Sequence, residues 1–183
     1  MLVVEEKRKS NVVEYVILMY QIEDLIRAYN FSITEIKQKL IIPQTPSESL
    51  IPSVELWYKT IIDEMMSQKI ERKGHLSRIQ EVIMELIYVH NTLLNMLKDP
   101  KYIELVERAT STIEEFRKKS DLGEIHPVEV ALQAMYMKLL LRLQRKEISA
   151  ETEDAFDSMR ILLAYLSKSY KDLYEGKLGS SDQ

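Results

Sequence analysis

The sequence predicts an all-α fold, a single-domain antiparallel helical bundle of about six to seven helices. Only four glycines and five prolines occur in 183 residues, so the chain lacks the frequent turns that a β-sandwich or barrel requires. No glycine-rich phosphate-binding motif is present, which disfavours a nucleotide-binding α/β fold. Apolar residues instead recur at steps of three and four, the spacing of amphipathic helices. Residues 1–176 are predicted to form one domain, and residues 177–183 a frayed tail.

The first half of the chain predicts three helices and one irregular segment. A helix over residues 11–29 is apolar on nearly every side, which is typical of a central helix in a bundle. A short helix follows, opened by the capping sequence at 32–35 and ended by a group of prolines. These prolines lie in residues 43–53, which are predicted to form an irregular loop. The next helix is expected over residues 52–73, with Gly74 as its C-terminal cap.

The second half of the chain predicts four helices joined by short connections, which favours antiparallel neighbours. The first of them carries an apolar seam in which His90 takes one of the apolar positions. Cap residues followed by proline or by an apolar repeat mark the starts of the later helices. The four helices are expected to begin at His75 or Ser77, at Pro100, at Pro127 and after Ser149, and the last to end at Gly176.

Charge and cysteine content exclude several classes of function. The chain has 25 basic and 29 acidic residues, so a nucleic-acid partner is disfavoured. It has no cysteine, which excludes disulfides, thiolate nucleophiles and thiolate metal sites. Charges occupy the N-terminal region where a signal peptide needs an apolar core, and the longest nearly uncharged apolar run, residues 16–22, is too short to span a membrane. We expect a cytoplasmic protein with no membrane span and no cofactor.

Charged residues on the first predicted helix are the main candidates for a functional site. They are Glu14, Glu23, Asp24 and Arg27, and Arg27 lies within ion-pairing reach of both Glu23 and Asp24. These groups form either a polar site inside the bundle or a surface ion pair that needs no ligand. Because an unpaired buried charge is costly, we expect each to find a partner, and Glu14 to reach a tyrosine or His90.

His90 is a further candidate because it interrupts an apolar seam. A metal site would require at least two more ligands, and Glu85 lies on a different face of the same helix. The Glu-x-x-His pattern of helical di-iron proteins is therefore absent. We interpret His90 as a buried histidine that is hydrogen bonded to a neighbour, and His75 and His126 as helix-capping residues. No metal site is predicted.

Tyrosine is unusually abundant, with ten tyrosines against three phenylalanines and one tryptophan. Tyr165, Tyr170 and Tyr174 on the last helix could line a pocket. Tyrosine also suits the margins of a bundle, where its ring is buried and its hydroxyl stays in water. Packing at the margins is the favoured interpretation.

Four segments carry a resemblance to a known family. They are residues 15–28, 73–76, 139–152 and 163–170, and they resemble an uncharacterised all-helical family of Bacteroidetes with a domain-of-unknown-function label. The resemblance covers nearly the whole chain and implies a small cytoplasmic protein of about this length. It implies no established activity and no catalytic or ligand-binding residue.

Two classes of function remain. The first is a non-enzymatic helical protein that acts through protein–protein contacts or homo-oligomerisation, because the chain has no nucleophile motif, phosphate loop or metal-ligand spacing. The alternative is a small helical enzyme or ligand-binding protein with an interior polar site on the first helix and at His90. That alternative requires these groups to converge on one cavity.

Overall fold

The computed structural model describes residues 2–177, and over this range it contains helices and no strand. Seven of its α-helices are nine or more residues long. The prediction of an all-helical single domain is therefore confirmed. Met1 and residues 178–183 lie outside the described residues, and so does all of the predicted tail except Lys177.

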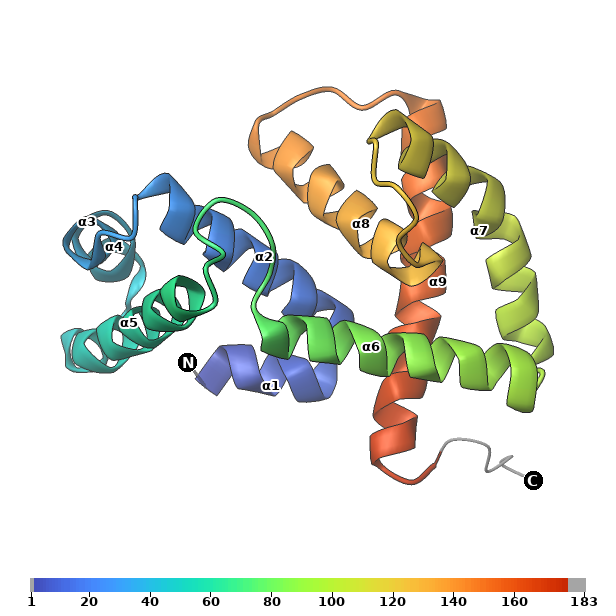
Figure 1. Ribbon diagram of the computed structural model, residues 1–183, viewed down its shortest axis with the longest axis horizontal. Coiled ribbons are helices and arrows are strands. Elements are labelled where there is room, and N and C mark those ends of the chain that lie inside the picture. Colours follow the sequence, from blue (N-terminus) through green and yellow to red (C-terminus); the bar gives the residue numbers. More distant parts are fainter. Residues whose placement is uncertain (1, 178–183) are drawn as a thin grey trace.

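Five long helices form the bundle and contribute most of its buried core. One of them packs against each of the other four and lies at the centre. A second helix runs across this central helix at a steep angle (Figure 1). The bundle helices are α2 (Val12–Ala28), α6 (Ser77–Asn91), α7 (Pro100–Lys119), α8 (Pro127–Leu143) and α9 (Ala150–Tyr174), of which α9 is the central one and α6 crosses it.

The apolar helix α2 packs against α6, α8 and α9 and against a helix that the sequence analysis did not predict. This additional helix, α1 (Leu2–Ser10), precedes α2. Its run of charged residues gives little apolar periodicity, which explains why it was missed, although Val4 is buried. α2 begins as expected at Asn11, whose side chain accepts a hydrogen bond from the backbone N–H of Glu14.

A smaller group of helices extends from the bundle as an arm, seen at the left of Figure 1. The predicted loop over residues 43–53 is wrong in most of its length, and only residues 45–47 are irregular. Pro43 lies in a three-residue α-helical turn that continues directly from a π-helical turn, and the helical run ends at the next residue, Gln44. The arm consists of α3 (Ile33–Ile36), a π-helical turn (Lys37–Ile41), α4 (Ile42–Gln44), a 3₁₀ turn (Glu48–Leu50) and α5 (Ile51–Ser67).

α5 ends at Ser67, six residues before the predicted end. The chain turns at Lys69, which has a left-handed backbone with φ of 57°, and the N–H of Ile70 bonds to the carbonyl of Met65. A left-handed C-terminal cap is usually glycine, so a lysine in this role gives no sequence signal. Gly74 is instead part of the loop over residues 68–76, where its φ of 96° requires glycine.

The helix starts of the second half agree with the predictions. The side chains of Asp99, His126 and Ser149 each accept a hydrogen bond from a backbone N–H in the first turn of α7, α8 and α9. α6 continues into a π-helical turn (Thr92–Met96), which rotates the residues that follow it. Leu97, which directly follows this turn, is exposed as a result, and Leu143 is exposed in the last turn of α8.

Candidate functional site

Glu23 is completely buried and binds the loop between α5 and α6. Its Oε1 accepts a hydrogen bond of 2.9 Å from the backbone N–H of Leu76, and its Oε2 accepts one of 2.6 Å from Nδ1 of His75. The ring of Tyr20 stacks on the ring of His75, with 3.8 Å between centroids. Glu23 therefore holds the loop against α2. His75 contacts Tyr20 and Glu23 of α2 and does not cap α6.

Arg27 binds the same loop from the next turn of α2. Its Nη1 donates to Asp24 at 2.9 Å, which is one of the two predicted ion pairs. Its Nη2 donates to the carbonyl oxygens of Ile70 and Gly74. Glu23 and Arg27 together form what we call the α2 clamp, which fastens residues 70–76 to the end of α2. The clamp explains these buried charges without any ligand.

Asp24 connects the clamp to the bundle. Its second carboxylate oxygen accepts a hydrogen bond of 2.6 Å from the hydroxyl of Tyr136 on α8. Burial raises the pKa of Tyr136, and its hydrogen bond to Asp24 raises the pKa further. The phenol is therefore neutral and acts as a donor throughout the physiological range.

The other two candidates lie apart from the clamp. Glu14 is exposed near the opposite end of α2 and forms an ion pair with Lys7 of α1, so it does not reach His90. His90 is hydrogen bonded through Nδ1 to the hydroxyl of Tyr102 at 2.7 Å. Within residues 2–177, no group of three His, Asp or Glu side chains could hold a metal ion.

His90 is a buried histidine, 6% exposed, as its position on the seam indicates. Burial lowers its pKa to about 4, and the neighbouring His126, 5.1 Å away between ring centroids, lowers it in the same direction. Burial and then the charge of Arg117 also lower the pKa of His126. Both rings are therefore neutral near pH 7 and pack together without acting as charged groups.

Replacing Arg27 tests the clamp. Arg27→Ala is expected to lower the free energy of unfolding by about 2 kcal/mol, because hydrogen bonds to a charged group contribute about 1.5–3 kcal/mol. Urea unfolding measures the loss. Arg160→Ala is the control, because Arg160 is exposed and pairs with Asp157 three residues before it, and its loss should stay below about 1 kcal/mol. Equal losses in the two variants would contradict the clamp.

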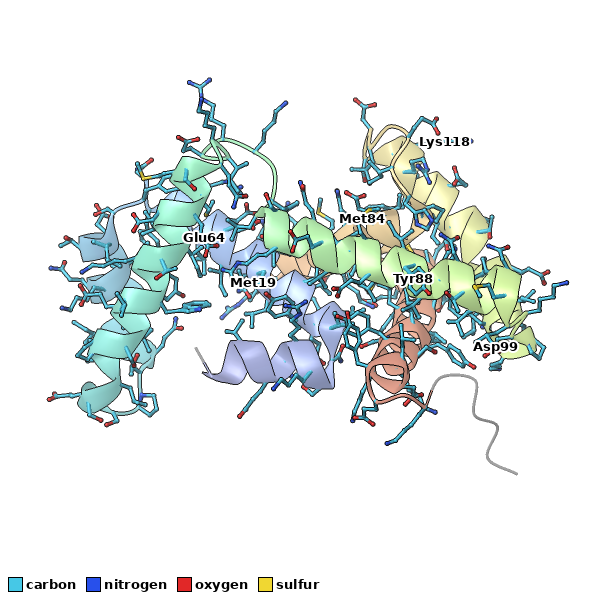
Figure 2. The ribbon with its side chains drawn as sticks, turned by 60° about the horizontal axis from the view of Figure 1, so that its bottom comes forward. Met19, Glu64, Met84, Tyr88, Asp99 and Lys118 are labelled. Carbon is cyan, nitrogen blue, oxygen red and sulfur yellow. The ribbon has the colours of Figure 1, made fainter. Side chains whose placement is uncertain are left out.

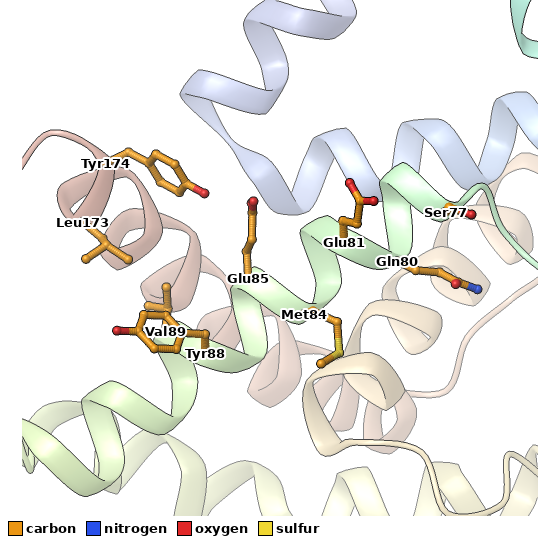
Figure 3. Close-up of a pocket in the computed structure, with 9 residues that line it drawn as sticks. All are labelled: Ser77, Gln80, Glu81, Met84, Glu85, Tyr88, Val89, Leu173 and Tyr174. Carbon is orange, nitrogen blue, oxygen red and sulfur yellow. The ribbon is translucent and has the colours of Figure 1, made fainter.

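A separate feature is an open groove of about 710 Å³ between α6 and α9, which we call the α6–α9 groove (Figure 3). Three large side chains at this groove are unusually exposed: Met84 is 63% exposed, Tyr88 59% and Tyr174 62%. Figure 2 shows Met84 and Tyr88 along α6. The groove is lined by Ser77, Gln80, Glu81, Met84, Glu85, Tyr88, Val89, Leu173 and Tyr174.

Met84 and Tyr88 were not predicted as functional residues. They lie four positions apart, one helical turn, on the side of α6 away from its apolar seam. An apolar pair on an otherwise polar helix face is the signal that could have found them. Of the candidate tyrosines, Tyr174 lines the groove, whereas Tyr170 is buried and donates to Glu85 at 2.5 Å. Tyr165 donates to Asp99.

Acidic residues line the groove, and basic residues line a neighbouring hollow. Glu81 and Glu85 extend from one side of α6 and Met84 from the other (Figure 3). A second hollow of about 460 Å³ continues beyond Tyr174, with basic residues of α1 in its lining. Arg8 pairs with Glu85 at 3.6 Å. Glu81 and Lys9 form no ion pair with any residue in the described part of the chain, which leaves one charge of each sign without a partner at this surface.

The fold defines the chain as a single-domain, all-helical protein with an exposed aromatic and methionine-lined groove. It belongs to the family described as Domain of unknown function (DUF4924), whose family model matches residues 1–177. The resemblance seen in the sequence is confirmed at the level of that family. Neither a curated protein nor a solved structure matches the chain. Across residues 2–177, no helix has the length and apolar character required to cross a membrane.

Proposed function

We propose that this chain is a non-enzymatic cytoplasmic protein that acts through protein contacts, with the α6–α9 groove as the contact surface and a second copy of the chain as the occupant. The observation that carries the proposal is the grouping of Met84, Tyr88 and Tyr174, each more than half exposed, in one groove. Aromatic residues and methionine are enriched in protein interfaces, and methionine adapts to irregular partner surfaces.

The charges at the groove favour a second copy over an unrelated partner. A two-fold symmetric contact uses the same surface of both copies. With the two α6 helices antiparallel, the apolar pair Met84 and Tyr88 of one copy faces the same pair of the other, and Glu81 and Lys9, each unpaired within one copy, are the charges that would pair across the contact. The two charges that have no partner within one copy then pair across the contact. The surface is self-complementary in both its apolar and its charged parts.

The alternative, an interior polar site on the first helix and at His90, receives less support. Both carboxylate oxygens of Glu23 accept hydrogen bonds from the chain's own donors. Glu14 and His90 have partners of their own in other parts of the fold. A site for a polar substrate would need some of these groups to be free. We therefore interpret the clamp as a set of contacts that stabilises the fold.

Self-association is tested by measuring the molar mass in solution over a range of protein concentrations, by light scattering after gel filtration. Wild type is expected to form dimers, and Tyr88→Glu monomers, because a charge at the centre of an apolar contact loses its hydration without gaining a partner. Met66→Asp is the control, since Met66 is also exposed but lies on α5, away from the groove, and this variant should remain dimeric. A monomeric wild type, or a dimeric Tyr88→Glu variant, would refute the proposal.

Charge exchange then distinguishes a two-fold contact from any other mode of association. Glu81→Lys and Lys9→Glu, made singly, should each raise the dimer dissociation constant by roughly fivefold, the scale of the two symmetry-related exposed ion pairs that each change removes. The double variant should restore the wild-type value, because the pair is rebuilt with its charges exchanged. If the double variant associates more weakly than either single one, Glu81 and Lys9 do not meet.

A further inference from the structure

A second groove lies on α2, α8 and α9 and uses none of the residues of the α6–α9 groove. It has a volume of about 600 Å³, within the range of small-molecule sites. Its floor is apolar and is formed by Val13, Ile17, Met135, Leu139 and Leu163, of which Val13, Met135 and Leu163 are buried. We call it the α2–α8–α9 groove.

One wall of this groove is a chain of alternating charges between α8 and α9. Glu153 lies between Arg142, at 3.5 Å, and Lys138, at 2.5 Å. Asp157 lies between Lys138, at 3.5 Å, and Arg160, at 3.0 Å. The Lys138 side chain is only 7% exposed, and its Nζ also lies over the ring of Phe156. Three cations therefore share two carboxylates, and the wall carries one net positive charge.

The two arginines at the ends of this chain keep unused donors. Arg142 contacts its carboxylate through Nη2 alone, and Arg160 through Nε alone. A guanidinium has five N–H donors, so each arginine retains donors for a further anion. Both line the groove. Glu14 also lines it, and its charge is balanced by Lys7.

We propose that the α2–α8–α9 groove binds a single-chain anionic amphiphile of the fatty-acid class. The carboxylate lies against the charged wall at one of its two terminal arginines, Arg142 or Arg160, where it neutralises the excess positive charge, and the alkyl chain lies on the apolar floor. Charge-assisted hydrogen bonds from guanidinium groups are among the strongest that a carboxylate can accept. An inorganic anion would leave the floor uncovered, and an uncharged hydrocarbon would leave the excess positive charge unbalanced.

The test measures the binding of dodecanoate, of dodecanol and of acetate to the wild-type chain by native mass spectrometry and titration calorimetry. Dodecanoate is expected to bind with a stoichiometry of one per chain, and the other two at least about tenfold more weakly, because each lacks either the charge or the chain. Equal binding of dodecanoate and dodecanol would overturn the proposal. Displacement of dodecanoate by an acidic helical peptide would also overturn it, because the groove would then be a peptide site.

Two variants locate the site. Replacing both Arg142 and Arg160 with glutamate should weaken dodecanoate binding by about tenfold or more, and Leu139→Trp should weaken it by filling the floor. Arg145→Glu combined with Lys146→Glu is the control matched in charge, since Arg145 and Lys146 are exposed beyond the end of α8 and do not line the groove. Far-ultraviolet circular dichroism verifies that each variant is folded. If this control weakens binding as much as the replacement of Arg142 and Arg160, the effect is one of net charge and the assigned site is wrong.

Discussion

Glu23→Ala is expected to lower the free energy of unfolding by about 3–5 kcal/mol, the cost of breaking a buried charged contact by removing one partner. The carboxylate is fully buried and is the acceptor for both His75 Nδ1 and the backbone N–H of Leu76. Without it, two donors of the loop lose their acceptor in a site where water does not replace it. Urea unfolding at neutral pH measures the effect.

Two further variants define the origin of this loss. Glu104→Ala removes an exposed carboxylate that pairs with Lys101 and should change stability by less than about 1 kcal/mol. Glu23→Gln keeps an acceptor oxygen for one of the two donors, so its loss should be intermediate. If Glu23→Ala is as stable as Glu104→Ala, the loop is not held by this carboxylate and the α2 clamp is incorrect.

The second large effect is a loss of stability in acid that depends on His90. Because burial lowers the pKa of His90 to about 4 from its ordinary value of 6.5, the unfolded chain binds this proton more readily than the folded chain. The stabilisation of the folded chain that depends on a neutral His90 is therefore complete above about pH 6.5 and is lost as the pH falls towards 4. The loss of unfolding free energy amounts to about 2 kcal/mol at about pH 5 and about 3 kcal/mol at lower pH.

The contribution of His90 is isolated by comparing wild type with His90→Gln. Glutamine does not titrate and retains a polar atom for Tyr102. The difference in unfolding free energy between about pH 7.5 and about pH 5 should be about 2 kcal/mol smaller in the variant. His126 shifts in the same direction and is present in both proteins, so its contribution cancels. The same pH dependence in both proteins would contradict a neutral, buried His90.

Features that depend on a few neighbouring residues could be predicted from the sequence. The caps at Asp99 and Ser149 are hydrogen bonds within one helical turn, and the Arg27–Asp24 pair spans three residues. The end of α5 could not be predicted, because a lysine at position 69 occupies the left-handed position where glycine is usual.

Contacts between distant residues account for what was missed at the candidate sites. Glu23 and His75 are 52 residues apart, and no local pattern relates them. Glu14 was expected to reach inward, but its actual partner, Lys7, belongs to a helix that was itself not predicted. The α6–α9 groove depends on the packing of α9 across α6, so the sequence offers Met84 and Tyr88 as an apolar pair on a polar helix face but does not place them beside Tyr174.

The α2 clamp has a consequence for the evolution of the chain's topology. The chain leaves the bundle after Ala28 and returns to it at His75, and Arg27 is hydrogen bonded to Gly74 across that gap. The arm is therefore an insertion whose two ends are adjacent, and the entropy cost of closing such a loop rises only slowly with its length. The arm can therefore be lengthened, shortened or exchanged while the five bundle helices keep their connections and their order.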